Sequence, residues 1–304
     1  MAASTSRQPR LLDPLWRFLR ALRAAFTVLL YLVVAPSGLL PYVLFRLFFR
    51  GTPEQRARIL QRTSARGVRI MHWWLRTFRV IHFDWRQVRL ELPAGPCVIV
   101  ANHPTQLDPT VMMAVLGEAC TIVKPSVYNR LFVHHILAGA WHFEGPSLDP
   151  MSVGHVVENA VERLRCGMHL FVFPEAKRSP QGRLREFGRI GFEIACRANV
   201  PLVSIAIRCE PCYLSRETPM FLPPAQLPRV FVEVLAVDRP QEVGADSRAL
   251  KQRVEGRYRQ WVADGMPPVA LQSAALSAAE GRQPTSPGAS GLPARSSMRP
   301  PTGT

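Results

Sequence analysis

The amino-acid sequence predicts an α/β fold with a mixed, largely buried sheet flanked by helices. Short apolar runs are typical of strands buried on both faces, and two occur at Cys97–Ala101 and His169–Phe173, with further strands predicted at Pro201–Ile207 and Val230–Val237. Amphipathic segments separate them. The clearest one ends at Gly167 and carries a stripe at helical spacing, made of Val153, Val156, Val157, Ala160, Val161 and Leu164. Strands that alternate with such helices predict an α/β domain.

The first candidate element is Ala24–Phe45, 22 residues without a charge. A helix of that length can span a bilayer, but Pro36-Ser37-Gly38 and Pro41 interrupt it. The uninterrupted part, Ala24–Val34, makes roughly 16 Å of helix, about half of a hydrocarbon core. Arginines crowd both flanks, at Arg17, Arg20, Arg23, Arg46, Arg50, Arg56 and Arg58. Because a full span would leave one basic flank on the wrong side, we expect an N-terminal membrane-associated helical hairpin in one leaflet, with a span as the alternative.

The next element is a helix that begins at Thr52–Gln55. Threonine is a good cap, proline suits the first turn, and glutamine occupies the position of a capping box. The helix should run towards Phe78, and Gly67 is the point at which it would break. Its arginines and its Trp73 and Trp74 suit a membrane surface, but they suit a helix packed on the core equally well. Both alternatives stay open from the sequence.

The remaining segments complete the predicted domain. Alternating apolar residues predict a half-buried strand at Val88, Leu90 and Leu92, and helical spacing predicts a closing helix through Leu250, Val254, Tyr258 and Trp261. From Met266 onward the chain is rich in Pro, Ser, Ala and Gly without a period, so we expect disorder there. The chain is therefore divided into an N-terminal membrane-association segment (1–50), an α/β domain (51–265) and a disordered tail (266–304).

Composition gives only general limits. The formal net charge is +16, which suits nucleic acid, anionic lipid or a phosphorylated substrate equally well. Six scattered cysteines do not predict a disulfide framework, and the C-x-x-C at Cys209 and Cys212 lacks a second pair. We therefore expect a reduced, cytoplasm-facing chain. His134, His135 and His142 have no recognised ligand spacing, so no metal and no cofactor are expected.

The first motif is Asn102–Asp108, directly after the strand Cys97–Ala101. Open α/β sheets place their ligands at the carboxyl ends of strands. A histidine there can remove a proton from an attacking hydroxyl, and a carboxylate on the other ring nitrogen would orient it. This makes His103 and Asp108 candidate catalytic residues. The alternatives are that Asp108 only caps the following helix and that His103 is an ordinary loop histidine.

The second motif is Phe173–Ser179, which also follows an apolar strand. Lys177 and Arg178 are adjacent cations beside the hydroxyl of Ser179, and arginine offers a bidentate fork to phosphate. We therefore predict an anion pocket, in which Glu175 either holds Arg178 or binds the substrate. The alternative is a solvated turn, but that alternative does not explain why two loops of unusual chemistry both leave strand ends.

Four ordered blocks resemble the 1-acyl-glycerol-3-phosphate (lysophosphatidate) acyltransferase family of the glycerolipid acyltransferase superfamily. They are NHPTQLD at 102–108, FPEAKRS at 173–179, FGRIGFEIA at 187–195 and VPLVSIAI at 200–207. The resemblance implies an acyltransferase of phospholipid biosynthesis. Such an enzyme would move a fatty acyl group from acyl-CoA or acyl-carrier protein to the hydroxyl of a lysophospholipid, with His103 as general base and Asp108 as its partner.

The resemblance implies that Glu175 and Arg178 belong to the acceptor-phosphate site. With the residue types it gives an expected set of substrate-binding residues: Asn102, Glu175, Lys177, Arg178, Ser179 and Arg189. The expected partners are the acyl donor, the lysophospholipid acceptor and a membrane surface, without nucleic acid. The expected location is the cytoplasmic face of the inner (plasma) membrane.

The departures from the family pattern concern the acceptor. The usual Gly-Thr of the second motif is Ala176-Lys177, Ile190 takes the place expected for a glycine, and the block Trp141–Gly145 contains no arginine. A different specialised lipid acceptor is therefore an alternative, as is a catalytically inactive membrane-binding relative. A serine hydrolase is not indicated, because no G-x-S-x-G occurs.

Overall fold

Seven strands form one mixed sheet in the computed structural model, which describes residues 13–37, 39–84, 92–130, 133–147, 150–180, 182–220 and 222–267. The sheet order is β1-β7-β6-β2-β5-β3-β4. Every neighbouring pair is parallel except β6 and β7. The strands are β1 (His82–Asp84), β2 (Val98–Ala101), β3 (Ala119–Val123), β4 (Phe143–Glu144), β5 (His169–Val172), β6 (Leu202–Glu210) and β7 (Arg229–Asp238). The predicted mixed α/β fold is confirmed.

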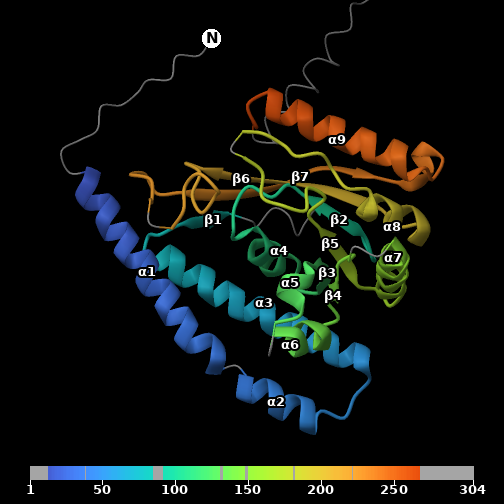
Figure 1. Ribbon diagram of the computed structural model, residues 1–304, viewed down its shortest axis with the longest axis horizontal. Helices are drawn as coiled ribbons and strands as arrows, with labels where there is room; N and C mark the ends of the chain where they lie inside the picture. Colours follow the sequence, from blue (N-terminus) through green and yellow to red (C-terminus); the bar gives the residue numbers. More distant parts are fainter. Residues whose placement is uncertain are drawn as a thin grey trace, which may run out of the picture. The chain divides into compact units, whose positions relative to one another are not determined.

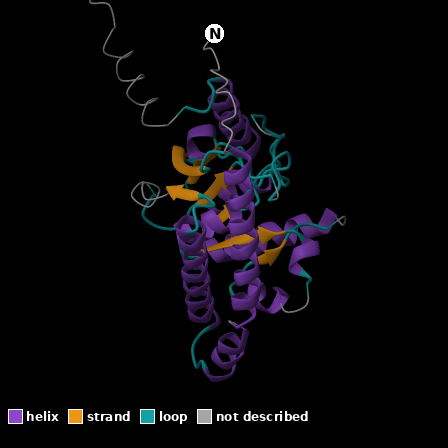
Figure 2. Ribbon diagram, turned by 90° about the vertical axis from the view of Figure 1, so that its left-hand side faces the viewer, coloured by secondary structure: helices purple, strands orange, loops and turns teal. Residues whose placement is uncertain are grey.

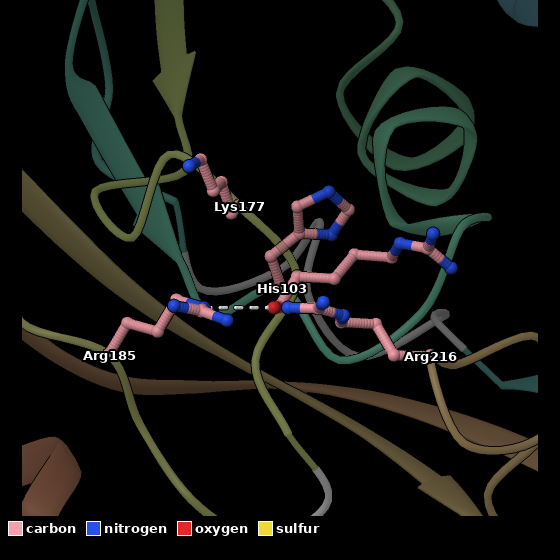
Figure 3. A pocket seen from close by; sticks show the side chains of 5 residues that line it. His103, Lys177, Arg185 and Arg216 are labelled. Atoms are coloured by element: carbon pink, nitrogen blue, oxygen red, sulfur yellow. Dashed lines mark hydrogen bonds between the residues drawn. The ribbon is translucent and has the colours of Figure 1, made fainter.

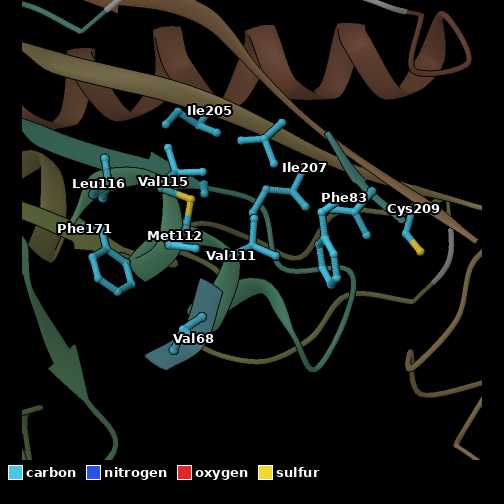
Figure 4. Packing of buried hydrophobic residues seen from close by; sticks show 14 of the residues in the cluster. Val68, Phe83, Val111, Met112, Val115, Leu116, Phe171, Ile205, Ile207 and Cys209 are labelled. Carbon is cyan, nitrogen blue, oxygen red and sulfur yellow. The ribbon is translucent and has the colours of Figure 1, made fainter. Parts of the chain in front are cut away.

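Helices cover both faces of this sheet (Figures 1 and 2). Ile99 and Ala101 of β2 pack with α3 and α4 in one apolar cluster (Figure 4), whereas Val98 and Val100 pack with α7, α8 and α9 in the other. Successive strand residues point to opposite faces, so the central strands are buried on both. The helices are α3 (Pro53–Thr77), α4 (Asp108–Leu116), α5 (Pro125–Tyr128), α6 (Val133–Gly139), α7 (Pro150–Arg165), α8 (Ile190–Ala198) and α9 (Ser247–Ala263).

Helix α3 begins as the sequence predicts. The Thr52 hydroxyl accepts from the Gln55 N–H at 3.2 Å, and Gln55 Oε1 accepts from the Thr52 N–H at 3.1 Å. The helix continues through Gly67 without the break that we considered, because one face with Val68 and Leu75 packs on the core. Trp73 is 61% exposed on the other side. Packing on the core is therefore confirmed for one face of this helix, and contact of the exposed face with a membrane stays a prediction.

Gly191 explains how α8 approaches the sheet so closely. A Cβ atom built at this position would lie 2.7 Å from Cγ2 of Val172 and 3.6 Å from Cγ1 of Val100. A contact of 2.7 Å is too short for two carbon atoms, so a side chain at this position would displace α8. The glycine that follows Ile190 thus serves the packing of α8 on β2 and β5.

The N-terminal segment forms two helices, α1 (Asp13–Ser37) and α2 (Leu39–Phe48). They separate at the predicted Pro-Ser-Gly interruption, although α1 begins well before the apolar run. No helix among the described residues combines the length and the apolar character that crossing a bilayer requires. Flanking arginines also form bonds within the protein, and Arg58 pairs with Glu54 and Glu118. Arg17 donates to the carbonyl of Pro223 at 3.2 Å, and Arg20 donates to the carbonyls of Pro224 and Gln226.

Other expectations have mixed outcomes. The six cysteines are free, as expected. The closing helix is α9, and the amphipathic stripe before Gly167 is α7. Most of the strand expected around Val88 and almost all of the tail lie outside the described residues. The short strands β1, β3 and β4 were not expected, because pairing with a neighbour rather than a sequence pattern defines them.

Two buried histidines should make the free energy of unfolding depend on pH. Burial lowers the pKa of His72 to about 3 and that of His142 to about 4, below the ordinary value of about 6.5. Below pH 6.5 the unfolded chain therefore binds more protons, and stability falls as pH falls. Each histidine should contribute up to about 1.4 kcal/mol per pH unit. Urea unfolding at pH 7, 6 and 5 should show a shallower fall for His142→Gln than for the natural chain.

The control for this prediction is His155→Gln, because His155 is exposed and should leave the pH slope unchanged. The buried carboxyls of Asp108 and Glu175 act in the opposite direction, because burial raises the pKa of both. The difference between variants, rather than the absolute slope, is therefore the quantity to compare. Equal slopes for His142→Gln and the natural chain would contradict the neutral, buried state of His142.

Candidate active site

The two predicted motif loops lie side by side because β2 and β5 are parallel neighbours. Their carboxyl ends reach the same edge of the sheet, where α/β folds place ligands. The Ser179 N–H donates to the His103 carbonyl at 2.9 Å, which joins the loop after β5 to the loop after β2. This local arrangement positions the side chains of both loops around one cavity.

His103 and Asp108 form a hydrogen-bonded pair, with 2.7 Å between Nδ1 and Oδ2. Asp108 is fully buried and also accepts from the Thr105 N–H at 2.7 Å and from the Thr105 hydroxyl. An ionised carboxylate can only accept, so Nδ1 of His103 carries the proton and Nε2 is the basic nitrogen. The ring stacks on Phe173, with 4.5 Å between the ring centroids. This arrangement fixes both the orientation and the tautomer of His103.

The pKa of Asp108 reflects its burial beneath His103 and its hydrogen bonds. Burial raises the pKa of the Asp108 carboxyl, and hydrogen bonds from His103 and Thr105 oppose that rise. Capping does not account for this residue: the cap position of α4 is Leu107, and no side chain caps the helix there. The carboxylate of Asp108 instead contacts the side chain of His103 and both donors of Thr105.

Glu175 joins three segments of the site. Its side chain is 4% exposed. Oε1 accepts from the His103 N–H at 3.0 Å, and Oε2 accepts from the Arg185 N–H at 2.8 Å. Burial raises the pKa of Glu175, and these two backbone hydrogen bonds oppose the rise. Among the described residues Glu175 forms no ion pair with Arg178, so its contacts are those of a residue that positions the backbone of His103.

Glu175→Ala should destabilise the protein and reduce its activity. The substitution leaves two N–H groups without their acceptors, at about 1–3 kcal/mol for each buried group. For a chain of this size, ~1 kcal/mol corresponds to roughly 2–4 °C in Tm, so thermal unfolding should begin several degrees lower. The control is Glu186→Ala, because Glu186 is exposed and pairs with Lys251 at the surface. Equal Tm values for both variants would contradict this role of Glu175.

Five residues line a cavity of about 540 Å³ at this edge: His103, Lys177, Arg178, Arg185 and Arg216. Figure 3 shows the side chains of His103, Lys177, Arg185 and Arg216 around this cavity. Four of the five are cations, and none is a carboxylate, so the cavity favours an anionic ligand. Lys177 and Arg178 were predicted from the sequence. Arg185 and Arg216 were missed; only the arginine-rich segment after Ser179 could have pointed to Arg185.

The loop after β5 also accommodates its departure from the family pattern. Ala176, where the family usually has glycine, adopts a φ of 56°. That left-handed conformation favours glycine, so alanine adopts it at some cost in strain. The next residue, Lys177, then lines the cavity.

Four of the predicted substrate-binding residues do not line this cavity: Glu175, described above, and Asn102, Ser179 and Arg189. Both ends of the Asn102 amide bond the backbone of Ile207, at 2.9 Å and 2.7 Å, so Asn102 extends the pairing of β2 with β6. Ser179 is buried beside the cavity and contributes the backbone bond to His103. Arg189 is exposed at the start of α8.

Comparison with known proteins agrees with this architecture. A family model described as Acyltransferase matches residues 86–208. The chain is 27% identical to human 1-acyl-sn-glycerol-3-phosphate acyltransferase beta over 149 residues, 47% of this chain and 53% of the human protein. It is 25% identical to the 1-acyl-sn-glycerol-3-phosphate acyltransferase of Pseudomonas aeruginosa over 186 residues, 60% of this chain and 71% of that protein.

The fold is also similar to a solved structure. The crystal structure of the 1-acyl-sn-glycerophosphate acyltransferase PlsC from Thermotoga maritima superposes with a TM-score of 0.60 at 19% identity, and the match covers 84% of this chain and 98% of that one. The match to the human relative spans about half of that protein's length.

The structure thus places a histidine–carboxylate pair beside a cationic cavity at the strand ends of the sheet. Residues 86–208 match the Acyltransferase family model, and the relatives named above are 1-acyl-sn-glycerol-3-phosphate acyltransferases.

Proposed function

We propose that this protein transfers a fatty acyl group from a thioester donor, acyl-CoA or acyl-carrier protein, to the hydroxyl of a lysophospholipid. The observation that carries this proposal is the His103–Asp108 pair, which opens onto a cavity lined with cations. The names of the relatives support 1-acyl-sn-glycerol-3-phosphate as the acceptor.

In the proposed reaction, Nε2 of His103 removes the proton of the acceptor hydroxyl as its oxygen attacks the thioester carbonyl. The tetrahedral intermediate collapses to an ester and expels the donor thiolate. The thiolate then takes the proton that the imidazolium of His103 holds. Asp108 stabilises the imidazolium while it exists and keeps the ring in its productive tautomer. The acceptor oxygen attacks directly, so the protein supplies no nucleophile of its own.

A second candidate is transfer to a different specialised lipid acceptor. It is favoured by the block Trp141–Gly145, which contains no arginine, and by Ala176-Lys177 in place of the usual Gly-Thr. Purified protein should be incubated with acyl-CoA or acyl-carrier protein and a panel of lysophosphatidate, lysophosphatidylcholine and monoacylglycerol. Selective product from lysophosphatidate supports the first candidate. Selective product from another acceptor supports the second, and no transfer with any pair contradicts both.

The proposed membrane surface is the exposed apolar stripe of α1, at Leu15, Phe18, Leu22, Phe26 and Leu29. These residues recur at i, i+3, i+7, i+11 and i+14, which places them on one side of the helix. On soluble surfaces such contiguous apolar area is uncommon and marks an interaction site. We propose that α1 lies in the interface at the cytoplasmic face of the inner membrane, with the active site on the same side.

Phe18→Asp with Leu22→Asp should reduce binding to vesicles that contain anionic lipid, because two charges would enter the apolar layer. Co-sedimentation with such vesicles measures the bound fraction. The matched control is Val153→Asp, since Val153 is exposed on α7, far along the chain from this stripe. If the double variant binds as the natural chain does, α1 is not the membrane surface.

A further inference from the structure

The last rung of the ladder between β2 and β6 lies directly before the loop that carries His103. The final pair of these parallel strands joins Ala101 to Ile205, and His103 follows two residues after Ala101. Beyond this rung a side chain continues the pairing, since the amide of Asn102 bonds the backbone of Ile207. The position of His103 therefore depends on how firmly this end of the ladder is held.

Ile205 lies beside an irregularity in the sheet. On its other side β6 pairs with β7, and the register of that pairing shifts between Ser204 and Ile205, as in a β-bulge. A bulge interrupts the regular ladder and bends the strand. The rung at Ile205 thus has a regular neighbour on one side only, so support from another part of the fold has an effect there.

That support comes from Tyr258 of α9, the helix that packs on this face of the sheet (Figure 1). The side chain of Tyr258 is fully buried. Its hydroxyl oxygen lies 2.6 Å from the carbonyl oxygen of Ile205 and 3.1 Å from that of Val100. The hydroxyl therefore donates to β6 and β2 next to their last rung. Because a buried hydroxyl is costly unless it is bonded, and phenylalanine would fill the same space, the hydroxyl serves the two strands rather than the packing.

The same side chain contacts two further parts of the site. Burial raises the pKa of the Tyr258 hydroxyl well above its usual range, and the nearby carboxylate of Glu175 raises it further, so the hydroxyl keeps the proton that it donates. Glu175 in turn accepts from the His103 N–H. The ring of Tyr258 packs edge-on against Phe187, with 5.3 Å between the ring centroids, and Phe187 follows Arg185 closely in the chain.

We propose that Tyr258 is a positioning residue for His103: its hydroxyl holds the ends of β2 and β6 together and so fixes where the loop 102–108 begins. The proposal rests on the acyl transfer proposed above, in which His103 is the general base. A displacement of about 1 Å can lower the rate of an enzyme by about 10²-fold. The five residues that line the cavity do not include any from α9, so this helix acts through the strands.

Helix α9 is anchored by contacts that are independent of the cavity. The guanidinium of Arg257 forms two hydrogen bonds with the carboxylate of Asp238, at the end of β7, at 2.7 Å and 3.0 Å. Such bidentate pairs fix orientation as well as position. The first turn is capped by Asp246, whose carboxylate accepts from the Arg248 N–H at 2.8 Å. Tyr258, the neighbour of Arg257 in the chain, is thus placed before any substrate binds.

The first test compares Tyr258→Phe with Trp261→Phe, a control on the same helix. Trp261 is also buried, and its indole N–H donates to the Pro267 carbonyl at 3.1 Å rather than to a strand. Tyr258→Phe should lower kcat roughly 10-fold, the factor that corresponds to one hydrogen bond, and leave the KM values for donor and acceptor nearly unchanged. Trp261→Phe should lower Tm at least as much, because it also removes ring volume, but should leave kcat unchanged. Unchanged kcat in Tyr258→Phe, or an equal loss in both variants, overturns the proposal.

The second test is a double-mutant cycle with His103→Ala. If Tyr258 acts by placing the imidazole, Tyr258→Phe should not lower the residual rate of His103→Ala any further, because no imidazole is left to place. A general loosening of the fold would instead lower the rate by the same factor in both backgrounds. Equal factors therefore contradict a positioning role for Tyr258.

Proton NMR provides a readout that does not depend on turnover. The proton between Nδ1 of His103 and Oδ2 of Asp108, which are 2.7 Å apart, should give a low-field resonance that His103→Ala removes. Tyr258→Phe should shift or broaden this resonance, and Trp261→Phe should leave it in place. If the natural chain transfers no acyl group, the proposed function fails, and the resonance still tests Tyr258. An unchanged resonance in Tyr258→Phe overturns the assignment.

Discussion

His103→Ala should lower kcat for acyl transfer by about 10²–10⁴-fold, the contribution typical of a positioned general base. Without the imidazole, the acceptor hydroxyl attacks the thioester while it still carries its proton. The KM values for donor and acceptor should change little, because the cations of the cavity remain in place. Release of free CoA from acyl-CoA in the presence of lysophosphatidate measures the rate.

The fold should tolerate this substitution. His103 lies at the edge of the sheet beside a cavity, and its backbone bonds to Glu175 and Ser179 do not depend on the side chain. Tm and membrane binding should therefore remain close to those of the natural chain. The matched control is His155→Ala, an exposed histidine on α7, which should retain full activity. Unchanged transfer by His103→Ala would rule out the proposed mechanism.

Asp108→Asn should have the second largest effect, with kcat lower by about 10²–10⁴-fold. The amide nitrogen donates where the carboxylate accepts, and three donors from His103 and Thr105 converge on this position. The ring of His103 then either loses its partner or adopts the other tautomer, which removes the basic Nε2. Steady-state kinetics with saturating donor and acceptor measure the loss.

Stability should respond much less than activity. Burial raises the pKa of Asp108, so ionisation of this group is less favourable in the folded than in the unfolded chain. Its contribution to stability is fully present at low pH and is lost as pH rises through the raised pKa. Removing the charge therefore relieves a desolvation cost at neutral pH and offsets part of the lost hydrogen bonding. Asp264→Asn, at the exposed end of α9, is the control, and full activity of Asp108→Asn would exclude Asp108 as the partner.

The parts of the fold that the sequence predicted well are those governed by local interactions. The strands β2, β5 and β6 follow from short, largely apolar runs, because a strand buried on both faces admits few polar side chains. The start of α3 follows from Thr52 and Gln55, since capping is a contact between residues close in sequence. The pairing of His103 with Asp108 belongs to the same category, because one short loop after one buried strand brings them together.

The sequence predicted less of the structure at places where segments far apart in the chain meet. The edge strands β1, β3 and β4 exist because a neighbouring strand offers hydrogen bonds, and their residues carry no strong pattern of their own. The expected alternatives for Glu175 were an ion pair with Arg178 or contact with substrate, whereas its carboxylate accepts from the backbone N–H groups of His103 and Arg185. Such contacts depend on how two loops fold against each other.

The sequence by itself determined the class of this protein: a sheet of buried strands, two motif loops at strand ends, and a histidine with its carboxylate. Periodicity, capping and short loops are local, so they can be inferred without coordinates. Only the tertiary structure decided which cations surround His103. Arg216 reaches the cavity because β6 lies beside β2 and because Gln106 and Arg178 hold the loop at Leu214. Those contacts join residues far apart in the chain, and no local pattern encodes them.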